Sequence, residues 1–527
     1  MLTEEPWLYE VQELDHQIFK QVVRDQHPLR LALERIPWEE FREPVEAYYS
    51  PHLGQPAFDP LRMLKLEYLR YHYHLSDRQV IERAETDFSF RYFLHIGLRG
   101  HLPDPSSLTR FRGRLKAEGF RAIFDRLVGI AREQGIVKDR LRLKDASHVI
   151  ANIAVPTTLK LIAQTRDYLL TAAAPFDSEA AEGHRINIEL LRERTKDQPA
   201  AERLESRVIH LQELLAWVEQ IKPPRDQADG ATKKAWQHLV DARELTRKIL
   251  FDQAHPEAGR RTLSIVDPEA RRGKHGDWYD GYVVDILMDA DSGLITQVNT
   301  LEAGGDEAKD AVELVRREEA EHGNDIEALS MDGAGFNGEM LHQLEDAKDG
   351  PGLTTYVPPK AEQASERFAA ADFTAREDKS HVTCPAGKDS RYRQRDSRDH
   401  GFLYRFTREQ CDTCPWAARC VARPGQGAFG RTVNKSDYEA EYQRARERAK
   451  TTAYASTRQV HPAVERKLNE VLNHHGGRRA RYWGLPKVDI QECMACFTVN
   501  VKRFLQLTRN VGSLQCARSV SLGDQRA

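Results

Sequence analysis

The chain has 527 residues, of which 40% are hydrophobic and 30% charged, and its formal net charge is −3. This balance is ordinary for a globular protein, and the length allows more than one domain. No apolar run approaches the ~20 residues that a membrane span needs. The first residues lack the basic start and apolar stretch of a secretory signal. We therefore expect a cytoplasmic protein rather than a membrane-spanning or secreted one.

The N-terminal section, to about residue 119, has the pattern of short helices. Residues 60–71 repeat apolar side chains every three to four positions, which predicts an amphipathic helix. Ser76 and Gln79 have the spacing of a capping box that opens a helix over residues 77–85. Ser106 or Ser107 is expected to cap a third helix. Such helices suit a helix-turn-helix DNA reader, although plain bundles contain them too. The third helix carries a row of cations: Arg110, Arg112, Arg114 and Lys116.

Strand patterns begin at residue 141 and predict an α/β core. A helical, charge-rich stretch over residues 157–253 interrupts this core and reads as an insertion, because strand patterns resume beyond it. The remaining expected elements are an antiparallel hairpin (281–288 and 294–300), a helix (306–321), two short strands (326–331 and 354–357), a second insertion (about 360–450) and helices over 453–507.

The second insertion contains four of the seven cysteines, spaced as Cys384-x26-Cys411-x2-Cys414-x5-Cys420. No cysteine precedes Cys384, which argues against a disulfide framework. Four thiols in one loop-rich stretch predict a tetrahedral zinc site, and reduced thiols without a metal are the alternative. Cys493 and Cys496 lie in an apolar helical pattern, and we expect them to be buried core residues.

Two aspartates lie on or after predicted strands. Asp145 is within the first strand, and Asp332 follows a later strand just before a glycine-rich turn. The carboxyl ends of strands in an open α/β sheet are where sites form. Converging carboxylates bind hard divalent cations, and a third acid from a helix would complete a pair of metal sites. A simple turn role remains the alternative for either aspartate.

Cations gather in three stretches, although the whole chain is slightly acidic. Residues 91–116 hold six Lys and Arg against one acid, residues 379–423 hold ten against five, and residues 474–487 hold four and no acid. DNA affinity depends on where cations lie more than on net charge. A single stretch of this kind is more often a solvated face than a DNA site, and the occurrence of three favours DNA binding only moderately.

From about residue 58 to residue 507, the chain resembles the DDE transposases of bacterial insertion sequences, in the group with a cysteine-bearing insertion before the last catalytic acid. Each motif is short, but together they occur in the order of that group. They are Phe58-Asp-Pro-Leu-Arg-Met-Leu, Leu75-Ser-Asp-Arg-Gln, Pro103-Asp-Pro-Ser-Ser-Leu-Thr-Arg-Phe-Arg, Lys144-Asp145-Ala-Ser, Val266-Asp-Pro-Glu-Ala-Arg, Gly281-Tyr, Met331-Asp332-Gly-Ala-Gly-Phe, Cys384-Pro-Ala-Gly, Cys411-x2-Cys414-Pro, Val464-Glu465-Arg-Lys, Arg478-Arg-Ala-Arg-Tyr-Trp-Gly484-Leu-Pro-Lys487 and Asn500-Val-Lys-Arg.

The resemblance implies a ribonuclease-H-like mixed-sheet core with an N-terminal helical DNA-binding domain and two insertions, one helical and one Cys-rich. It implies that Asp145, Asp332 and Glu465 hold two Mg²⁺ or Mn²⁺ per active site, in addition to a structural Zn²⁺. The partners implied are transposon-end DNA and target DNA, bound by a nucleoid-associated homodimer. The expected domains are residues 1–125 (DNA-binding), 138–359 with 451–510 (catalytic core), 157–255 (helical insertion), 360–450 (Cys-rich insertion) and 511–527 (tail).

We expect the basic residues to divide DNA contact between two surfaces. Arg110, Arg112 and Arg114 would recognise the ends, and a second set would hold the backbone beside the metals. That second set is Arg478, Arg479, Arg481 and Lys487.

In one respect the chain departs from the family pattern. Many DDE transposases place a basic residue about two turns after the catalytic Glu, and here position 472 is Leu. Arg466, Lys467 or the pair Arg478 and Arg481 could replace it. Glu470 is the alternative third carboxylate, but its helical spacing turns it away from Glu465. The competing functions are a non-catalytic DNA-binding protein derived from a transposase and a standalone nuclease.

Overall fold

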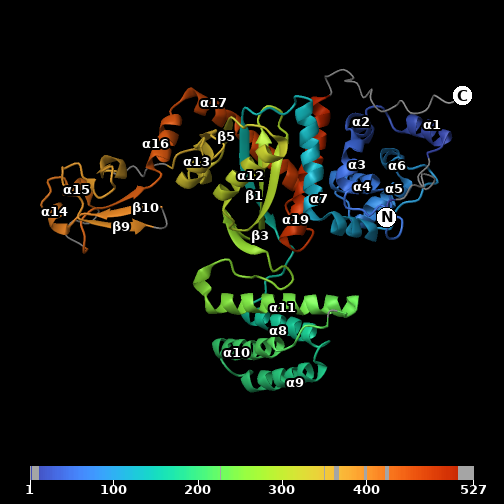
Figure 1. Ribbon diagram of the computed structural model, residues 1–527, viewed down its shortest axis with the longest axis horizontal. Coiled ribbons are helices and arrows are strands. Elements are labelled where there is room, and N and C mark those ends of the chain that lie inside the picture. The colour runs from blue at the N-terminus through green and yellow to red at the C-terminus, as the bar shows by residue number, and fades with distance from the viewer. Residues whose placement is uncertain are drawn as a thin grey trace.

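The computed structural model describes residues 2, 11–225, 227–348, 350–360, 367–396, 400–421 and 427–508. A twisted sheet stands at the centre of the molecule, with the N-terminal helices on one side (Figure 1). The Cys-rich module projects on the opposite side, and the helical insertion hangs below the sheet as a separate body (Figure 1). The expected tail and Cys516 lie outside the described residues.

The N-terminal section folds into short helices with one shared core. The helix predicted over residues 60–71 is confirmed as α4 (Pro60–His72), and the predicted capping box of Ser76 and Gln79 opens α5 (Asp77–Thr86). Asp59 caps α4 by accepting a hydrogen bond from the Leu61 amide. The other elements are α1 (Glu13–Val22), α2 (Pro28–Arg35), η2 (Trp38–Phe41), α3 (Arg42–Glu46) and α6 (Phe88–Leu94).

The helix α7 (Ser106–Glu133) connects this section to the sheet and differs from expectation in two ways. Ser106 is already helical, and the Asp104 carboxylate accepts from its amide at 2.8 Å, so the expected Ser106 or Ser107 cap is wrong. A carboxylate two residues earlier satisfies that amide instead. The helix also runs through the expected domain boundary at residue 125, with one left-handed residue, Lys116 (φ 54°), inside it.

The central sheet is mixed. The strands are ordered β2-β3-β1-β5-β6, and β4 pairs with β3. The chain visits β1, the β2–β3–β4 meander, a helix, β5, a helix and then β6. β1 pairs antiparallel with β3 and parallel with β5. The predicted hairpin is confirmed as β3 and β4, whereas β2 was not expected. The bounds are β1 (Arg142–Ile150), β2 (Arg271–His275), β3 (Asp277–Asp289), β4 (Ile295–Glu302), β5 (Ala328–Ser330), β6 (Thr354–Tyr356), α12 (Glu307–His322) and α13 (Gly338–Glu345).

The two faces of β1 have different chemistry. On one face Leu143 and Val149, with Ile286 of β3, join the apolar core that contains α7 and α19 (Leu485–Leu507). On the other face Arg142 and Lys144 are buried under α12 and paired with acids. Because side chains alternate along a strand, Asp145 belongs to the first face.

The segment expected as a helical insertion forms four helices with an apolar core of their own. They are α8 (Thr158–Ala173), α9 (Ser178–Thr195), α10 (Ala200–Glu219) and α11 (Gly230–Ala254), followed by η3 (Pro256–Ala258). None of the helices in the described ranges is both long and apolar enough to cross a membrane.

The Cys-rich module is built on small sheets, and a helical segment returns the chain to the core. The sheets are ordered β11-β10-β9 and β7-β8. The module comprises η5 (Ala370–Asp372), β7 (Thr374–Ala375), β8 (Val382–Thr383), β9 (Tyr392–Asp396), β10 (Gly401–Arg405), α14 (Arg408–Asp412), α15 (Ala417–Cys420) and β11 (Thr432–Ser436). The return segment comprises α16 (Glu439–Arg448), α17 (Thr452–Val460), α18 (Pro462–Asn469) and the π-helical η6 (Glu470–His474), which leads to α19. The prediction that Cys493 and Cys496 are buried on an apolar helix is confirmed, since they are 1% and 0% exposed on α19.

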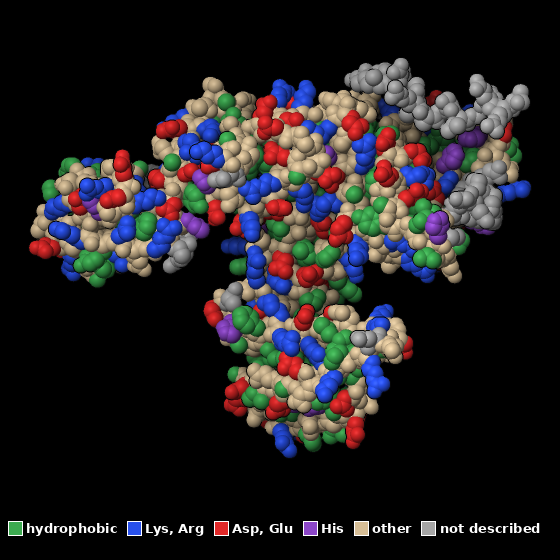
Figure 2. All heavy atoms as spheres, viewed as in Figure 1, with side chains coloured by type: hydrophobic (Ala, Val, Ile, Leu, Met, Phe, Trp, Pro, Cys, Tyr) green, Lys and Arg blue, Asp and Glu red, His purple; other side chains and the backbone are tan. Residues whose placement is uncertain are grey.

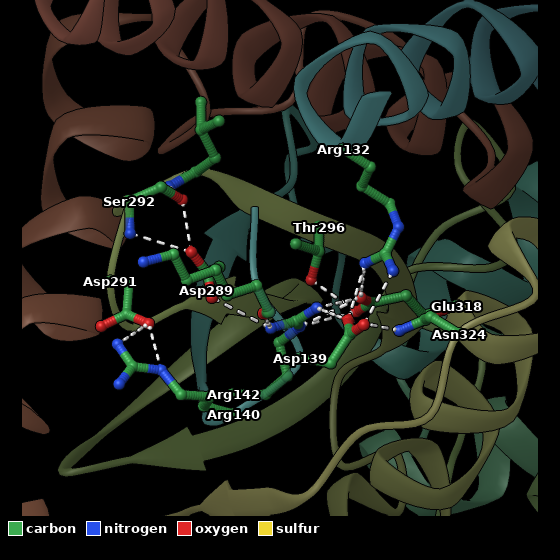
Figure 3. Close-up of polar contacts among 12 residues, drawn as sticks. Arg132, Asp139, Arg140, Arg142, Asp289, Asp291, Ser292, Thr296, Glu318 and Asn324 are labelled. Atoms are coloured by element: carbon green, nitrogen blue, oxygen red, sulfur yellow. Dashed lines mark hydrogen bonds and ion pairs between the residues drawn. The ribbon is translucent and has the colours of Figure 1, made fainter. Parts of the chain in front are cut away.

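A buried ionic network anchors the start of β1 (Figure 3). The Arg142 guanidinium is fully buried and lies 2.6 Å from Glu318 and 3.0 Å from Asp289. Glu318 also accepts from Thr296 of β4 at 2.6 Å. One guanidinium therefore joins β1, β3, β4 and α12.

We expect Arg142→Met to lower the free energy of unfolding by about 3–5 kcal/mol, because it leaves buried carboxylates without their cation. Arg140→Met is the matched control, since Arg140 is 61% exposed where it pairs with Asp291. This change should cost about 1 kcal/mol or less. Chemical denaturation followed by circular dichroism measures both, and equal losses would contradict the structural role of Arg142.

Candidate active site

Two parallel strands bring Asp145 and Asp332 to the same place. The register pairs Leu143 with Ser330, so Asp145 and Asp332 each lie two residues beyond a paired position. Two residues is one full period of a strand, which puts both acids on the face of Leu143 and Ser330. Asp332 ends its strand by capping η4 (Gly333–Gly335), where its carboxylate accepts from the Ala334 amide at 3.0 Å.

Glu465 comes from α18, which packs against β1. Two side chains hold this part of the chain to the end of β5. His461, buried and one turn before Glu465, has its Nδ1 atom 3.0 Å from the Ser330 hydroxyl. Arg458 donates to the Met331 carbonyl at 2.7 Å. Hydrogen bonds therefore join the end of β5, just before Asp332, to the helical turn that precedes Glu465.

The electrostatics place the three acids in one neighbourhood. The pKa of Asp145 is raised to about 6, first by burial and then by the like charges of Asp332 and Glu465. A hydrogen bond from the Ala146 amide and the charge of Lys144 oppose this rise. Like charges raise each other's pKa only when they lie near one another.

Cations do not neutralise this acidic group. In the part of the chain that the structure describes, no Lys or Arg forms an ion pair with any of its three carboxylates, Asp145, Asp332 or Glu465. By contrast, Glu470 pairs with Lys467 at 3.2 Å and with Lys502 at 2.8 Å. These two lysines therefore hold the Glu470 carboxylate. Its five-residue spacing from Glu465 had already indicated that it points away from the other acids.

The four cysteines of the insertion line one small cavity, together with Phe373 and Phe406. Burial raises the pKa of Cys420 to about 11 and also raises that of Cys411, and the other thiols of the set add to both shifts. Backbone amides already point at two sulfurs: Lys388 N lies 3.4 Å from Cys384 Sγ, and Arg431 N lies 3.2 Å from Cys411 Sγ.

Neither the three carboxylates nor the four thiols lie as close together as the ligands of a bound metal ion. Over the described ranges, no group of three or more His, Cys, Asp or Glu has the arrangement of a metal site. The expectation that the carboxylates and the sulfurs already form compact metal cages is therefore not met. Their metal-binding roles stay predictions.

The structure corrects the predicted role of Arg112. Its guanidinium is buried, lies 2.5 Å from Glu67 and also pairs with Asp77. These pairs hold α7 to α4 and α5, so the guanidinium cannot reach DNA. Arg110 and Arg114 are exposed.

Two cations of the second basic set are also occupied by the fold. Arg478 donates to the His148 carbonyl at 2.8 Å, and Arg481 donates to the Leu75 carbonyl and lies over the Tyr71 ring. They connect the 474–487 segment to β1 and to the N-terminal helices, and because both side chains are half-buried, their assignment to DNA stays a prediction. Arg479 and Lys487 are exposed.

Sequence reasoning missed the positioning contacts of Arg458 and His461. The only available signal was that His461 precedes Glu465 by four residues, which places both on one side of a helix. Their partners on β5 are too distant in the chain for any local pattern to show.

Comparisons with known proteins agree with this architecture at both ends of the chain. Residues 17–114 match a family described as a transposase domain (DUF772), and residues 383–505 match a family described as a transposase DDE domain. The second match includes Glu465 and the four cysteines, whereas Asp145 and Asp332 lie outside both matches.

One curated relative is the uncharacterized protein ORF8 in the nfe locus of Rhizobium meliloti, which is 30% identical over 105 residues. The aligned part is 20% of this chain, and the chain spans about half the length of that protein (50%). No solved structure matches the chain.

The two family matches and the mixed α/β sheet support a transposase. More particularly, they support a DDE transposase of insertion sequences. Transposases act on DNA, and DDE transposases use divalent metal ions.

The raised pKa of Asp145 predicts a pH-dependent effect of Asp145→Asn on the metal-free protein. Between pH 3.8 and about 6 the folded carboxyl keeps a proton that the unfolded chain releases, so wild-type stability falls as pH rises through this window. The variant should match wild type below pH ~4 and exceed it above pH ~6, by up to about 3 kcal/mol. Thermal unfolding with a chelator present measures the difference.

Glu470→Gln is the control, because this substitution should change the stability of the protein in the opposite direction. Burial works against ionisation of Glu470, but Lys502 and Lys467 hold its pKa below 4.5. That variant should therefore be less stable than wild type at neutral pH, and the difference should shrink as pH falls. An Asp145→Asn variant that loses stability at pH 8 would contradict the acidic cluster.

Proposed function

We propose that this transposase cleaves DNA at transposon ends and joins the freed ends to target DNA in an Mg²⁺-dependent reaction. The observation that carries the proposal is that Asp145, Asp332 and Glu465 come from three separate elements to one face of the sheet. They do so without a compensating cation in the described ranges, whereas nearby Glu470 has two. A site built to receive divalent cations leaves its carboxylates unpaired in this way.

The residues present fit two Mg²⁺ or Mn²⁺ ions, because carboxylate oxygens are the ligands that hard cations prefer. Bound divalent ions would supply activation of the attacking hydroxyl and neutralisation of charge on the reacting phosphate. The protein's part is positional. The β1–β5 register puts Asp145 and Asp332 on one face, and the contacts of Arg458 and His461 hold the chain before Glu465 to the end of β5, which supports the proposal that the three acids act together.

The proposed chemistry has two balanced steps in one site. First, water attacks the phosphodiester at the transposon end, and the broken P–O bond leaves a 3′-hydroxyl on the transposon strand. Second, that hydroxyl attacks a target phosphodiester and displaces the 3′-oxygen of the target strand, which leaves with a proton. No nucleotide cofactor is needed, because each broken P–O bond is matched by a new one.

The strand order supports a ribonuclease-H-like catalytic core. β1, β3 and β4 form the antiparallel part, β5 and β6 lie parallel to β1, and α12 connects the two parts. This is the hairpin, helix and strand order that the resemblance implies.

The exposed cations are the proposed DNA contacts. Arg110 and Arg114 on α7 would contact end DNA, and Arg479 and Lys487 would hold the backbone near the acids. Arg466 follows Glu465 and is exposed, whereas Lys467 is taken by Glu470. Arg466 is therefore the best replacement for the basic clamp. The protein would act as a homodimer that brings two ends together.

Glu465→Gln tests the catalytic proposal. The substrate is a plasmid that carries the gene with its natural flanking DNA, and the products are free 3′-ends and joined molecules. The variant should lose both products by at least about a hundredfold, because a ligand of the metal pair is gone. Glu470→Gln, five residues further along the helix, should keep activity within a few-fold.

Other outcomes identify the competing functions. Cleavage without joined products would show a nuclease, and DNA binding without either product would show a non-catalytic DNA-binding protein. Equal activity of wild type and Glu465→Gln would refute the assignment of Glu465.

The cysteine cluster is proposed to hold a structural Zn²⁺. Four thiols around one cavity match its preferred tetrahedral ligands, and the amides of Lys388 and Arg431 are placed to stabilise thiolates at Cys384 and Cys411. Four protein ligands leave no position for substrate, so the role would be structural.

Elemental analysis of protein purified without chelators should find one zinc per chain, since four thiolates complete one tetrahedral site. Cys414→Ser should lose the metal and destabilise the module. Cys493→Ser, on the buried face of α19, is the matched control and should retain the zinc even if it unfolds more readily. Full zinc content in Cys414→Ser, or none in wild type, would contradict the site.

A further inference from the structure

A cavity of about 430 Å³ lies between the four-helix insertion and the β2–β3 hairpin. Its walls come from the start of α8, the end of α11, the connection over residues 255–263, and the hairpin itself. At this junction Lys and Arg side chains adjoin hydrophobic ones on the surface (Figure 2). None of the roles proposed above uses this groove.

The groove combines an exposed aromatic ring with positive charge. Trp278 is 69% exposed, and Lys274 Nζ lies 5.8 Å from the centre of its ring. Arg260, Arg261 and Arg272 line the same cavity. A large aromatic side chain left in water beside cations is typical of a surface that stacks bases and binds phosphates.

The positive charge of the groove is not neutralised by the acidic residue that lines it. Its one acidic lining residue, Asp252, pairs with Lys248 and accepts from the Thr262 amide at 2.8 Å. Arg272 pairs with Asp280, but Arg261 and Lys274 form no ion pair in the described part of the chain. The groove therefore presents a net positive surface.

The backbone of the connection orients one of these arginines. Gly259 and Arg260 both have positive φ, 66° and 47°. This conformation is uncommon for a residue with a side chain. The Arg260 guanidinium donates to the Gly304 carbonyl at 3.2 Å, which fixes it near the hairpin.

The groove and the acidic group share strand β3, although Tyr282 and Val284 between them are buried in the apolar core. Ile286 of β3 pairs with Asp145, and Trp278 lies eight residues earlier on the same strand. An even separation puts Trp278 on the face of Ile286, and eight residues span ~26 Å of strand.

We propose that this groove binds a single strand of the DNA substrate. An unpaired base stacks on Trp278, and the adjacent phosphates lie on Arg261 and Lys274. This inference rests on the proposed function, because the strand is the substrate of the acidic site. It adds a second DNA site, separate from the acidic group and built jointly by the insertion and the hairpin.

The test measures DNA binding without catalysis, using the full chain and a labelled oligothymidine of about 30 nucleotides, longer than one stacking site requires. Trp278→Ala should weaken binding roughly tenfold, and Trp278→Phe should retain most of the affinity, because a phenyl ring still stacks. Trp416→Ala is the matched control, since Trp416 is 43% exposed in the Cys-rich module. It should bind as wild type does.

Two further measurements separate the parts of the proposal. Replacing Arg261 and Lys274 by Ala together should flatten the salt dependence of binding by about 1.4, the value for two phosphates on a single strand. A fully paired duplex should lose much less affinity from Trp278→Ala, because its bases are not free to stack. Unchanged oligothymidine binding by Trp278→Ala, or an equal loss with duplex and single strand, would overturn the proposal.

Failure of the catalytic proposal would look different. Asp145→Asn should bind oligothymidine as wild type does while producing no cleaved or joined DNA. If Asp145→Asn remains active but Trp278→Ala loses single-strand binding, the groove stands and the catalytic assignment fails.

Discussion

Parallel pairing of β1 with β5 is the constraint on which the rest of the molecule depends. The two strands lie on opposite sides of the helical insertion in sequence, and only a few backbone hydrogen bonds join them. The buried Arg142 network stabilises the start of β1 just below this pairing, by drawing acids from β3 and α12 onto one guanidinium. With the start of β1 held, a shift of register would be costly, because one residue of slip moves every side chain to the other face. The convergence of Asp145 and Asp332 follows from this register.

Polar chemistry is divided between the two faces of β1. The α12 face neutralises its buried charges internally: Arg142 is matched by Glu318 and Asp289, and Lys144 lies 2.6 Å from Asp285. The opposite face carries Asp145 and Asp332, which form no ion pair in the described part of the chain. The same strand thus contributes stability on one side and an unsatisfied negative site on the other.

The sequence predicted local features well and non-local ones poorly. The helix at residues 60–71, the capping box at Ser76 and the β3–β4 hairpin are set by side-chain periodicity or by residues a few positions apart, and the structure confirms them. The three acids were named from short motifs, and the structure places them in one neighbourhood while leaving their roles to be tested. The burial of Arg112 against Glu67, and the hydrogen bonds of Arg478 and Arg481 to backbone carbonyls, could not be predicted. A run of arginines has the same sequence whether it faces DNA or a distant carboxylate.

The central claim is that Asp145, Asp332 and Glu465 together hold divalent cations. The most direct measurement is a crystal structure of the protein soaked with Mn²⁺, with the ions located by their anomalous scattering. We expect anomalous peaks within about 2–2.5 Å of carboxylate oxygens from all three residues, the range of hard-cation coordination, with Glu470 still paired to its lysines. Peaks at Glu470, or at no more than one of the three carboxylates, would contradict the account.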